Sequence, residues 1–187
     1  STNVETIAKT VPALSADLGI ALDGDADRVI LISPEGKIIE GDQILYILAS
    51  IATNNHQFNS KIVGTTLTNS GLEKSLKNKG TQLYRSDVGD KNMLQLMRQT
   101  GSILGGENSG HIINLDYSPS GDGLLTALLV MKSMVELDKS VGELLHGLEL
   151  VPQFNYNIET DLTKLSNDLI AKLSDEANTN LHKAEYW

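Results

Sequence analysis

Three aspartates alternate with the two smallest residue types close to the beginning of the chain. The segment reads Leu22-Asp23-Gly24-Asp25-Ala26-Asp27-Arg28, and apolar runs flank it on both sides. Three carboxylates this close repel one another unless a cation or a set of N–H donors compensates their charge. Oxygen ligands at this density favour Mg²⁺, Ca²⁺ or Mn²⁺ over zinc. The pattern therefore predicts that Asp23, Asp25 and Asp27 bind a divalent metal, while Arg28 grips a phosphoryl oxygen beside it.

Two plainer interpretations of this segment have to be weighed. Aspartate and glycine are ordinary turn residues, so a solvated turn explains a bare Asp-Gly-Asp sequence. An EF-hand loop requires glycine at its sixth position and a bidentate glutamate at its twelfth. Counted from Asp23, those positions hold Arg28 and Pro34, which excludes an EF-hand.

A second polar segment, Gly105-Gly106-Glu107-Asn108-Ser109-Gly110-His111, interrupts the regular pattern of the chain. Its glycines allow a ligand to approach the backbone closely. Glu107 and Ser109 have the chemistry to hydrogen-bond vicinal sugar hydroxyls, and His111 to reach a reacting hydroxyl or phosphate. The alternative is a glycine-rich connection with a solvated Glu107 and a polar His111 at the start of a strand.

A third polar segment, Ser86-Asp87-Val88-Gly89-Asp90-Lys91, lies where a strand is expected to give way to a helix. A helix N-terminus and a lysine together can hold an anion. We count Asp90 among the expected substrate-binding residues, and Lys91 among the residues that contact phosphate or transfer a proton. A plain capping turn with an exposed lysine explains the same segment about equally well.

The composition limits the fold and the partners. Hydrophobic residues make up 40% of the 187 residues and aromatic residues only 4%, so Leu, Ile, Val and Ala must build the core, which suits helices covering a buried parallel sheet. A net charge of -9 argues against nucleic acid or an anionic membrane surface as the main partner. Cysteine is absent, and no apolar run approaches the ~20 residues of a membrane span. These features predict a cytoplasmic α/β protein that binds neither nucleic acid nor membrane.

The elements that must position the three segments follow from apolar periodicity. Residues 18–22 and 28–33 are expected to form a hairpin with the aspartates at its tip, and Asp42 is expected to cap the first helix, whose apolar face runs to Ile51. Strands and helices then alternate, which is the βαβ pattern of a mostly parallel sheet. The further strands are predicted at 61–65, 81–84, 102–104, 112–115 and 153–159, and the further helices at 71–79, 88–98, 122–137, 141–148 and 162–173.

Together the three segments resemble the α-D-phosphohexomutases. Residues 22–28 are similar to the metal-binding loop of that superfamily, and residues 106–111 to its sugar-specificity loop, in the same order and at a matching separation. The forms Val88-Gly89-Asp90-Lys91, Gly-Glu-x-Ser-Gly-His-Ile-Ile and Gly121-Asp122-Gly123 look most like the bacterial phosphoglucosamine mutases. Asn108 and Lys91 depart from the glutamine and arginine that are usual there.

The resemblance implies an isomerase that interconverts glucosamine 6-phosphate and glucosamine 1-phosphate through a phosphoserine and a bisphosphate intermediate, supplying cell-wall precursor synthesis. It implies that Asp23, Asp25 and Asp27 hold Mg²⁺ and that Arg28 contacts the phosphoryl group. Glu107 and Ser109 would bind the sugar, and His111 and Lys91 would transfer a proton or contact phosphate. A homodimer is left open.

By the same resemblance, residues 1–37 match the end of the second of four domains, and residues 150–187 match an incomplete start of the fourth. Residues 38–149 match the third domain, which is the sugar-specificity domain and has a mixed, mostly parallel sheet flanked by helices. The 187 residues contain neither the Ser-His-Asn-Pro nor the Arg-x-Ser-Gly-Thr-Glu sequence of the superfamily. We therefore expect this polypeptide alone to be inactive as a mutase. The alternatives are a phosphomannomutase or phosphoglucomutase, a non-catalytic sugar-phosphate-binding module, and a phosphatase with an aspartate nucleophile.

Overall fold

The computed structural model describes residues 4–52 and 60–153, together with 166, 168–169, 171–172 and 175–176. The chain divides into two compact units, Ser1–Pro152 and Gln153–Trp187. Nearly all described residues belong to the first unit. The strand predicted at 153–159 lies outside the described residues apart from Gln153, which is not in a strand. Within the helix predicted at 162–173, residues 168–169 and 171–172 are helical and exposed.

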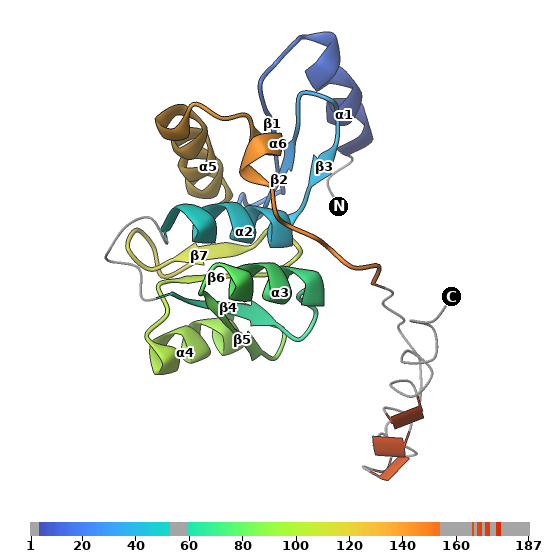
Figure 1. Ribbon diagram of the computed structural model, residues 1–187, viewed down its shortest axis with the longest axis vertical. Helices are drawn as coiled ribbons and strands as arrows, with labels where there is room; N and C mark the ends of the chain where they lie inside the picture. Colours follow the sequence, from blue (N-terminus) through green and yellow to red (C-terminus); the bar gives the residue numbers. More distant parts are fainter. Residues whose placement is uncertain are drawn as a thin grey trace. The chain divides into compact units, whose positions relative to one another are not determined.

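The aspartate segment connects two strands of a small antiparallel sheet, as the sequence predicted. Strand β1 (Gly19–Leu22) pairs with β2 (Val29–Ile32), Leu22 opposite Val29, and β2 pairs with β3 (Ile38–Ile39). Helix α1 (Val4–Ala13) packs against β1 and β2 (Figure 1). The aspartates therefore follow directly after one strand and precede the next.

The second sheet has the strand order β5-β4-β6-β7. Strands β4 (Lys61–Thr65), β5 (Gln82–Ser86) and β6 (Leu104–Gly106) are parallel, and β7 (Ile112–Asn114) closes the edge antiparallel to β6. Helix α3 (Ser70–Asn78) connects β4 to β5, and helix α4 (Asp90–Thr100) connects β5 to β6. The predicted mixed, mostly parallel sheet flanked by helices is confirmed.

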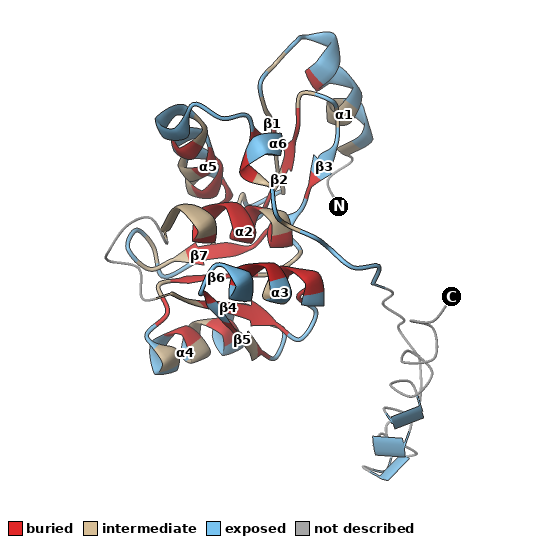
Figure 2. Ribbon diagram, in the orientation of Figure 1, coloured by how far each residue is buried: buried red, intermediate tan, exposed pale blue. Residues whose placement is uncertain are grey.

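Alternation along the strands gives this sheet two buried faces (Figure 2). Ile62 and Ile112 pack in the main core with α3 and with α2 (Gly41–Ala52). Their neighbours Val63 and Ile113 pack with Met93 and Met97 of α4. The sheet is thus the middle of three layers, with α2 and α3 on one face and α4 on the other.

Two further helices complete the first unit. Helix α5 (Gly123–Leu137) packs against α2 and β2, and its N-cap Asp122 accepts a hydrogen bond from Leu125 N. Helix α6 (Val141–Leu144) begins with a capping box of Ser140 and Glu143 and is shorter than the predicted 141–148. No helix among the described residues is both long and apolar enough to cross a membrane.

The prediction that Asp42 caps the first helix is wrong. Helix α2 begins at Gly41, and Asp42 lies within its first turn, 3% exposed. Its Oδ2 instead accepts a hydrogen bond of 2.8 Å from the backbone N–H of Asn69, the N-cap of α3. Asp42 therefore joins α2 to the start of α3, a tertiary contact that local sequence cannot reveal.

Candidate functional site

The aspartate loop is a tight turn held by its own side chains. Ala26 adopts a left-handed conformation with φ 59°, and its N–H donates to Asp23 O. Asp23 Oδ1 accepts a hydrogen bond of 3.2 Å from Arg28 N, and Arg28 Nε lies 3.9 Å from Asp23 Oδ2 and 3.8 Å from Asp27 Oδ1. One carboxylate oxygen from each of Asp23, Asp25 and Asp27 lies within 4.8 Å of the other two. The three predicted metal ligands therefore converge.

The aspartates differ in their affinity for protons. Partial burial, a hydrogen bond to Asp23 and the charges of Asp25 and Asp23 raise the pKa of Asp27, against the opposing effect of His111. Burial also acts to raise the pKa of Asp23, but hydrogen bonds from Arg28 N and with Asp27, together with the Arg28 charge, lower it overall. The loop thus concentrates negative charge that its single arginine compensates only in part.

The donor set fits a hard divalent cation. Asp27 Oδ1 is buried and has no hydrogen-bond partner among the described residues. A buried carboxylate oxygen without a donor is costly, and a cation removes that cost. Three carboxylates that can each offer an oxygen to one point are the ligands that Mg²⁺ or Mn²⁺ prefers.

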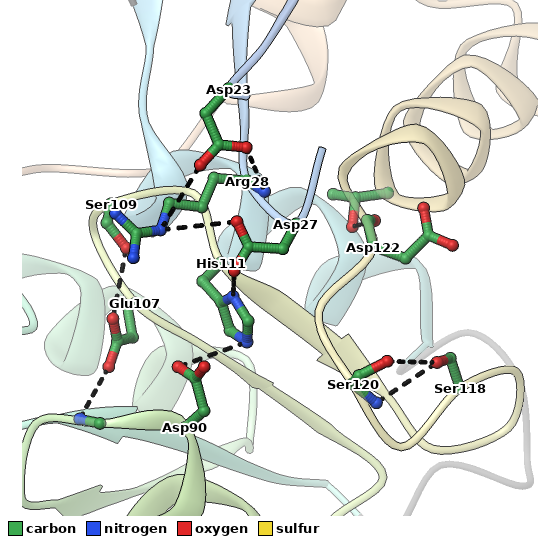
Figure 3. A network of polar contacts seen from close by, with 12 residues as sticks. Asp23, Asp27, Arg28, Asp90, Glu107, Ser109, His111, Ser118, Ser120 and Asp122 are labelled. Atoms are coloured by element: carbon green, nitrogen blue, oxygen red, sulfur yellow. Dashed lines mark hydrogen bonds and ion pairs between the residues drawn. The ribbon is translucent and has the colours of Figure 1, made fainter. Parts of the chain in front are cut away.

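His111 lies between the aspartate loop and the start of helix α4 (Figure 3). Its Nδ1 is 3.0 Å from Asp27 Oδ2, and its Nε2 is 3.4 Å from Asp90 Oδ1. The histidine is only 3% exposed. The structure thus brings together residues of all three polar segments, 84 positions apart in the case of Asp27 and His111.

Glu107 is held at the N-terminus of helix α4. Its Oε1 accepts a hydrogen bond of 3.1 Å from Gly89 N, and its Oε2 accepts one of 3.3 Å from Ser109 Oγ (Figure 3). The positive end of the helix dipole favours a carboxylate at this position. The sequence predicts that the N-terminus of helix α4 can hold an anion. In the structure this position is occupied by Glu107 of the same chain.

Backbone contacts join the two loops. Val29 N donates to Gly110 O at 3.1 Å, and Arg28 and His111 form an isolated antiparallel bridge. Gly110 has φ 91°, and a Cβ there would lie 2.1 Å from Val29 O. Only glycine combines this conformation with such a close approach. The first strand residue after the aspartate loop thus fixes the position of the histidine.

The ring of His111 is confined from its other side by Gly121. A Cβ added to Gly121 would lie 2.2 Å from His111 Cε1. Gly123 N also donates to Ala26 O at 2.8 Å, so this segment ties the aspartate loop to the start of α5. The sequence predicts a helix from residue 122, but not the contact of Gly121 with the histidine. The spacing of the small residues Gly121 and Gly123 was the available indication.

The remaining predicted residues have less direct positions. Asp90 is exposed, and its Oδ1 lies 3.4 Å from His111 Nε2. Lys91 is exposed in the first turn of α4, and none of the hydrogen bonds or ion pairs described for residues 60–153 involves its side chain. Asp122 caps α5. Asp25 is exposed at the tip of the aspartate loop.

Comparison with known proteins gives consistent matches. Residues 40–150 match the sequence model of the family described as phosphoglucomutase/phosphomannomutase, alpha/beta/alpha domain III. Phosphoglucosamine mutase 1 of Shewanella amazonensis is 42% identical over 178 residues, which are 94% of this chain and 40% of that protein. The chain thus spans well under half the length of this curated relative.

Two solved structures illustrate the similarity of fold. A phosphoglucomutase/phosphomannomutase family protein of Burkholderia thailandensis is 27% identical with a TM-score of 0.68, covering 79% of this chain and 32% of that one. The N-acetylphosphoglucosamine mutase of Aspergillus fumigatus, in complex with GlcNAc-6P and magnesium, is 20% identical with a TM-score of 0.59, covering 71% and 36%.

Proposed function

Since the chain belongs to the phosphoglucomutase/phosphomannomutase family, we propose that it forms the metal-binding and sugar-binding part of a phosphoglucosamine mutase. The whole enzyme would interconvert glucosamine 6-phosphate and glucosamine 1-phosphate through a phosphoserine and a bisphosphate intermediate. In this proposal residues 1–37 end the second domain, 38–149 form the third and 150–187 begin the fourth.

The contact between His111 Nδ1 and Asp27 Oδ2, 3.0 Å long, is the observation that carries the proposal. It places the loop that would bind metal and phosphoryl oxygens directly beside the loop that would bind the sugar. Phosphoryl transfer depends chiefly on positioning the reactants and stabilising charge. A site that binds the phosphoryl group and the sugar ring of one hexose phosphate at the same time needs these two loops side by side.

Each part of the site has a role in this proposal. Glu107 and Ser109 hydrogen-bond the sugar hydroxyls, and Asp90 contributes to binding from the start of α4. His111 holds or accepts a proton at Nε2, in a ring that Asp27 fixes from Nδ1. Arg28 binds a phosphoryl oxygen, and the exposed Lys91 contacts phosphate or transfers a proton.

Magnesium is the proposed cofactor, held by Asp23, Asp25 and Asp27. When bound, it would neutralise part of the negative charge on the phosphoryl group. The oxygen-only donor set supports this choice, as does the buried Asp27 Oδ1, which has no hydrogen-bond partner among the described residues. The magnesium complex of the Aspergillus mutase supports it as well, at the level of a shared fold.

A chimeric enzyme tests the proposed function. In the Shewanella amazonensis mutase, the 178 matching residues are replaced by this chain. We expect turnover of glucosamine 6-phosphate, lost on Asp25→Asn and retained on Asp87→Asn, which changes an exposed carboxylate outside the loop. A folded chimera without activity, or one that prefers mannose or glucose 6-phosphate, contradicts the assignment.

Calorimetry on the chain itself separates binding from catalysis. We expect Mg²⁺ to bind the wild-type chain and to bind Asp25→Asn at least about tenfold more weakly. Glucosamine 6-phosphate is expected to bind more weakly on Glu107→Gln. Binding without turnover in the chimera would leave a non-catalytic sugar-phosphate-binding module as the better assignment.

A further inference from the structure

Asp90 and His111 present two facing acceptor atoms. His111 Nε2 lies 3.4 Å from Asp90 Oδ1, and the two atoms belong to segments 21 positions apart. The Nε2 atom is buried and has no hydrogen-bond partner among the described residues. Figure 3 shows the ring edge pointing at the Asp90 carboxylate.

The other ring nitrogen determines what Nε2 can do. Nδ1 is 3.0 Å from Asp27 Oδ2, and an ionised carboxylate only accepts hydrogen bonds. Nδ1 therefore carries the hydrogen, and in the neutral ring Nε2 exposes its lone pair to the negative Asp90 oxygen. Such a pair is unfavourable unless a proton on Nε2 or a metal ion lies between the two atoms.

We propose that His111 Nε2 and Asp90 Oδ1 form a binding site for a divalent transition-metal ion of the zinc class, separate from the magnesium site of the aspartate loop. With a Zn–N bond of about 2.0–2.1 Å and a Zn–O bond of about 2.0–2.2 Å, the separation of 3.4 Å corresponds to an angle at the metal of roughly 110°. This is a tetrahedral angle, and water supplies the remaining ligands.

The surroundings of the histidine match those of zinc-bound histidines in proteins. Such a histidine usually donates its second N–H to a carboxylate, which fixes its tautomer and orientation. Asp27 occupies this place. Gly121, against the ring, and the backbone bridge to Arg28 restrict any movement of the imidazole. A nitrogen ligand also selects Zn²⁺, Co²⁺, Ni²⁺ or Cu²⁺ over Mg²⁺. The proposal does not depend on mutase activity, and a bound ion would block the proton transfer that the proposed function assigns to His111 Nε2.

Cobalt provides the test, because Co²⁺ substitutes for Zn²⁺ and its visible absorption reports tetrahedral coordination. The chain is titrated with Co²⁺ in the presence of saturating Mg²⁺, which occupies the aspartate loop. We expect a tetrahedral Co²⁺ spectrum that Zn²⁺ displaces. His111→Gln and Asp90→Asn should each remove it, while His146→Gln and Asp87→Asn, which change exposed residues of the same types, should retain it.

Further variants distinguish this site from the loop. Asp25→Asn removes a loop ligand that does not contact His111, so the cobalt spectrum should persist while Mg²⁺ binding weakens. Asp27→Asn should weaken Co²⁺ binding about 10- to 100-fold. Circular dichroism tests whether each variant is folded. Because the Asp90 side chain is largely exposed, Asp90→Asn still tests the site if the histidine variant does not fold. The proposal is wrong if folded wild-type protein gives no tetrahedral spectrum, or if both Asp90→Asn and His111→Gln retain it.

Discussion

Asp27 Oδ2 lies 3.0 Å from His111 Nδ1, so the third carboxylate of the aspartate loop also orients the histidine of the second loop. Asp27 therefore has two separable tasks. Its Oδ1 has no hydrogen-bond partner among the described residues and lies 3.8 Å from Arg28 Nε in the loop where a metal would bind, while its Oδ2 contacts the imidazole and favours the tautomer with the hydrogen on Nδ1. In the proposed function Asp25 has only the first of these tasks.

The first prediction compares Asp27→Asn with Asp25→Asn. Both should lower the affinity for Mg²⁺ by at least about tenfold, because each removes a charged oxygen ligand. Only Asp27→Asn should change the tautomer of His111, which ¹⁵N nuclear magnetic resonance of the ring nitrogens measures. The same ring spectrum in both variants would contradict a positioning role for Asp27.

A second prediction concerns the packing of Gly121 on the imidazole. Gly121→Ala would place a methyl group in the space of His111 Cε1, so the ring or the 117–123 segment must move. We expect a loss of about 1–3 kcal/mol in the free energy of unfolding, together with loss of the Asp27–His111 hydrogen bond. Urea denaturation and the ¹⁵N spectrum measure the two effects.

Gly142→Ala is the matched control for this variant. No atom of the described residues lies within 4 Å of a Cβ at Gly142, which is in helix α6, so alanine should leave stability unchanged or raise it by up to about 1 kcal/mol. Equal destabilisation by the two alanines would show that the contact with His111 is not what matters at Gly121.

A third prediction follows from the position of Glu107 at the start of α4. Glu107→Gln keeps an oxygen that accepts from Gly89 N and gains an amide group that can donate to Ser109 Oγ, but it removes the charge at the helix N-terminus. We expect the free energy of unfolding to fall by roughly 0.3–1 kcal/mol. We expect the free energy of binding glucosamine 6-phosphate to weaken by more than that. Glu136→Gln, at an exposed carboxylate paired with Lys132, should leave sugar-phosphate affinity unchanged in calorimetry.

The sequence predicted the elements better than the contacts between them. Short-range patterns predicted the hairpin, the alternation of β4 to β6 with α3 and α4, and the presence of helices α5 and α6. Tertiary partners were not accessible in this way. Asp42 has the residue type and position of a helix N-cap, yet its hydrogen bond goes to Asn69, 27 positions away. A local rule cannot choose between two backbone donors when one comes from a distant segment.

In the candidate site, too, the sequence indicates the residue types but not the contacts between them. The residue types of Asp23, Asp27, Glu107 and His111 indicate a site that binds metal, sugar and phosphate. Only the fold shows that Asp27 and Asp90 lie at different nitrogens of the His111 ring. The sequence does not explain why residue 121 is glycine, because no local structural feature requires one there. That reason is the imidazole packed against it.

The last prediction concerns pH and the buried Asp42. Burial raises the pKa of this carboxyl above its ordinary 3.8, although the hydrogen bond from Asn69 N and the Arg85 charge oppose the shift. Asp42 Oδ1 is buried without a hydrogen-bond partner among the described residues, which adds to the cost of the charged form. The folded state therefore binds the Asp42 proton more tightly than the unfolded state does.

The sign of the effect on stability follows from this difference. The contribution of Asp42 is fully present below pH 3.8 and is lost as the pH rises through the higher pKa of the folded state. Asp42→Asn retains an oxygen for Asn69 N and removes the titration. The free energy of unfolding of Asp42→Asn minus that of wild type should therefore increase as the pH rises from 4 toward 7. Urea denaturation across this range measures it, with Asp17→Asn, at an exposed carboxylate, as the control. A difference that is constant or falls with rising pH would show that burial does not govern the ionisation of Asp42.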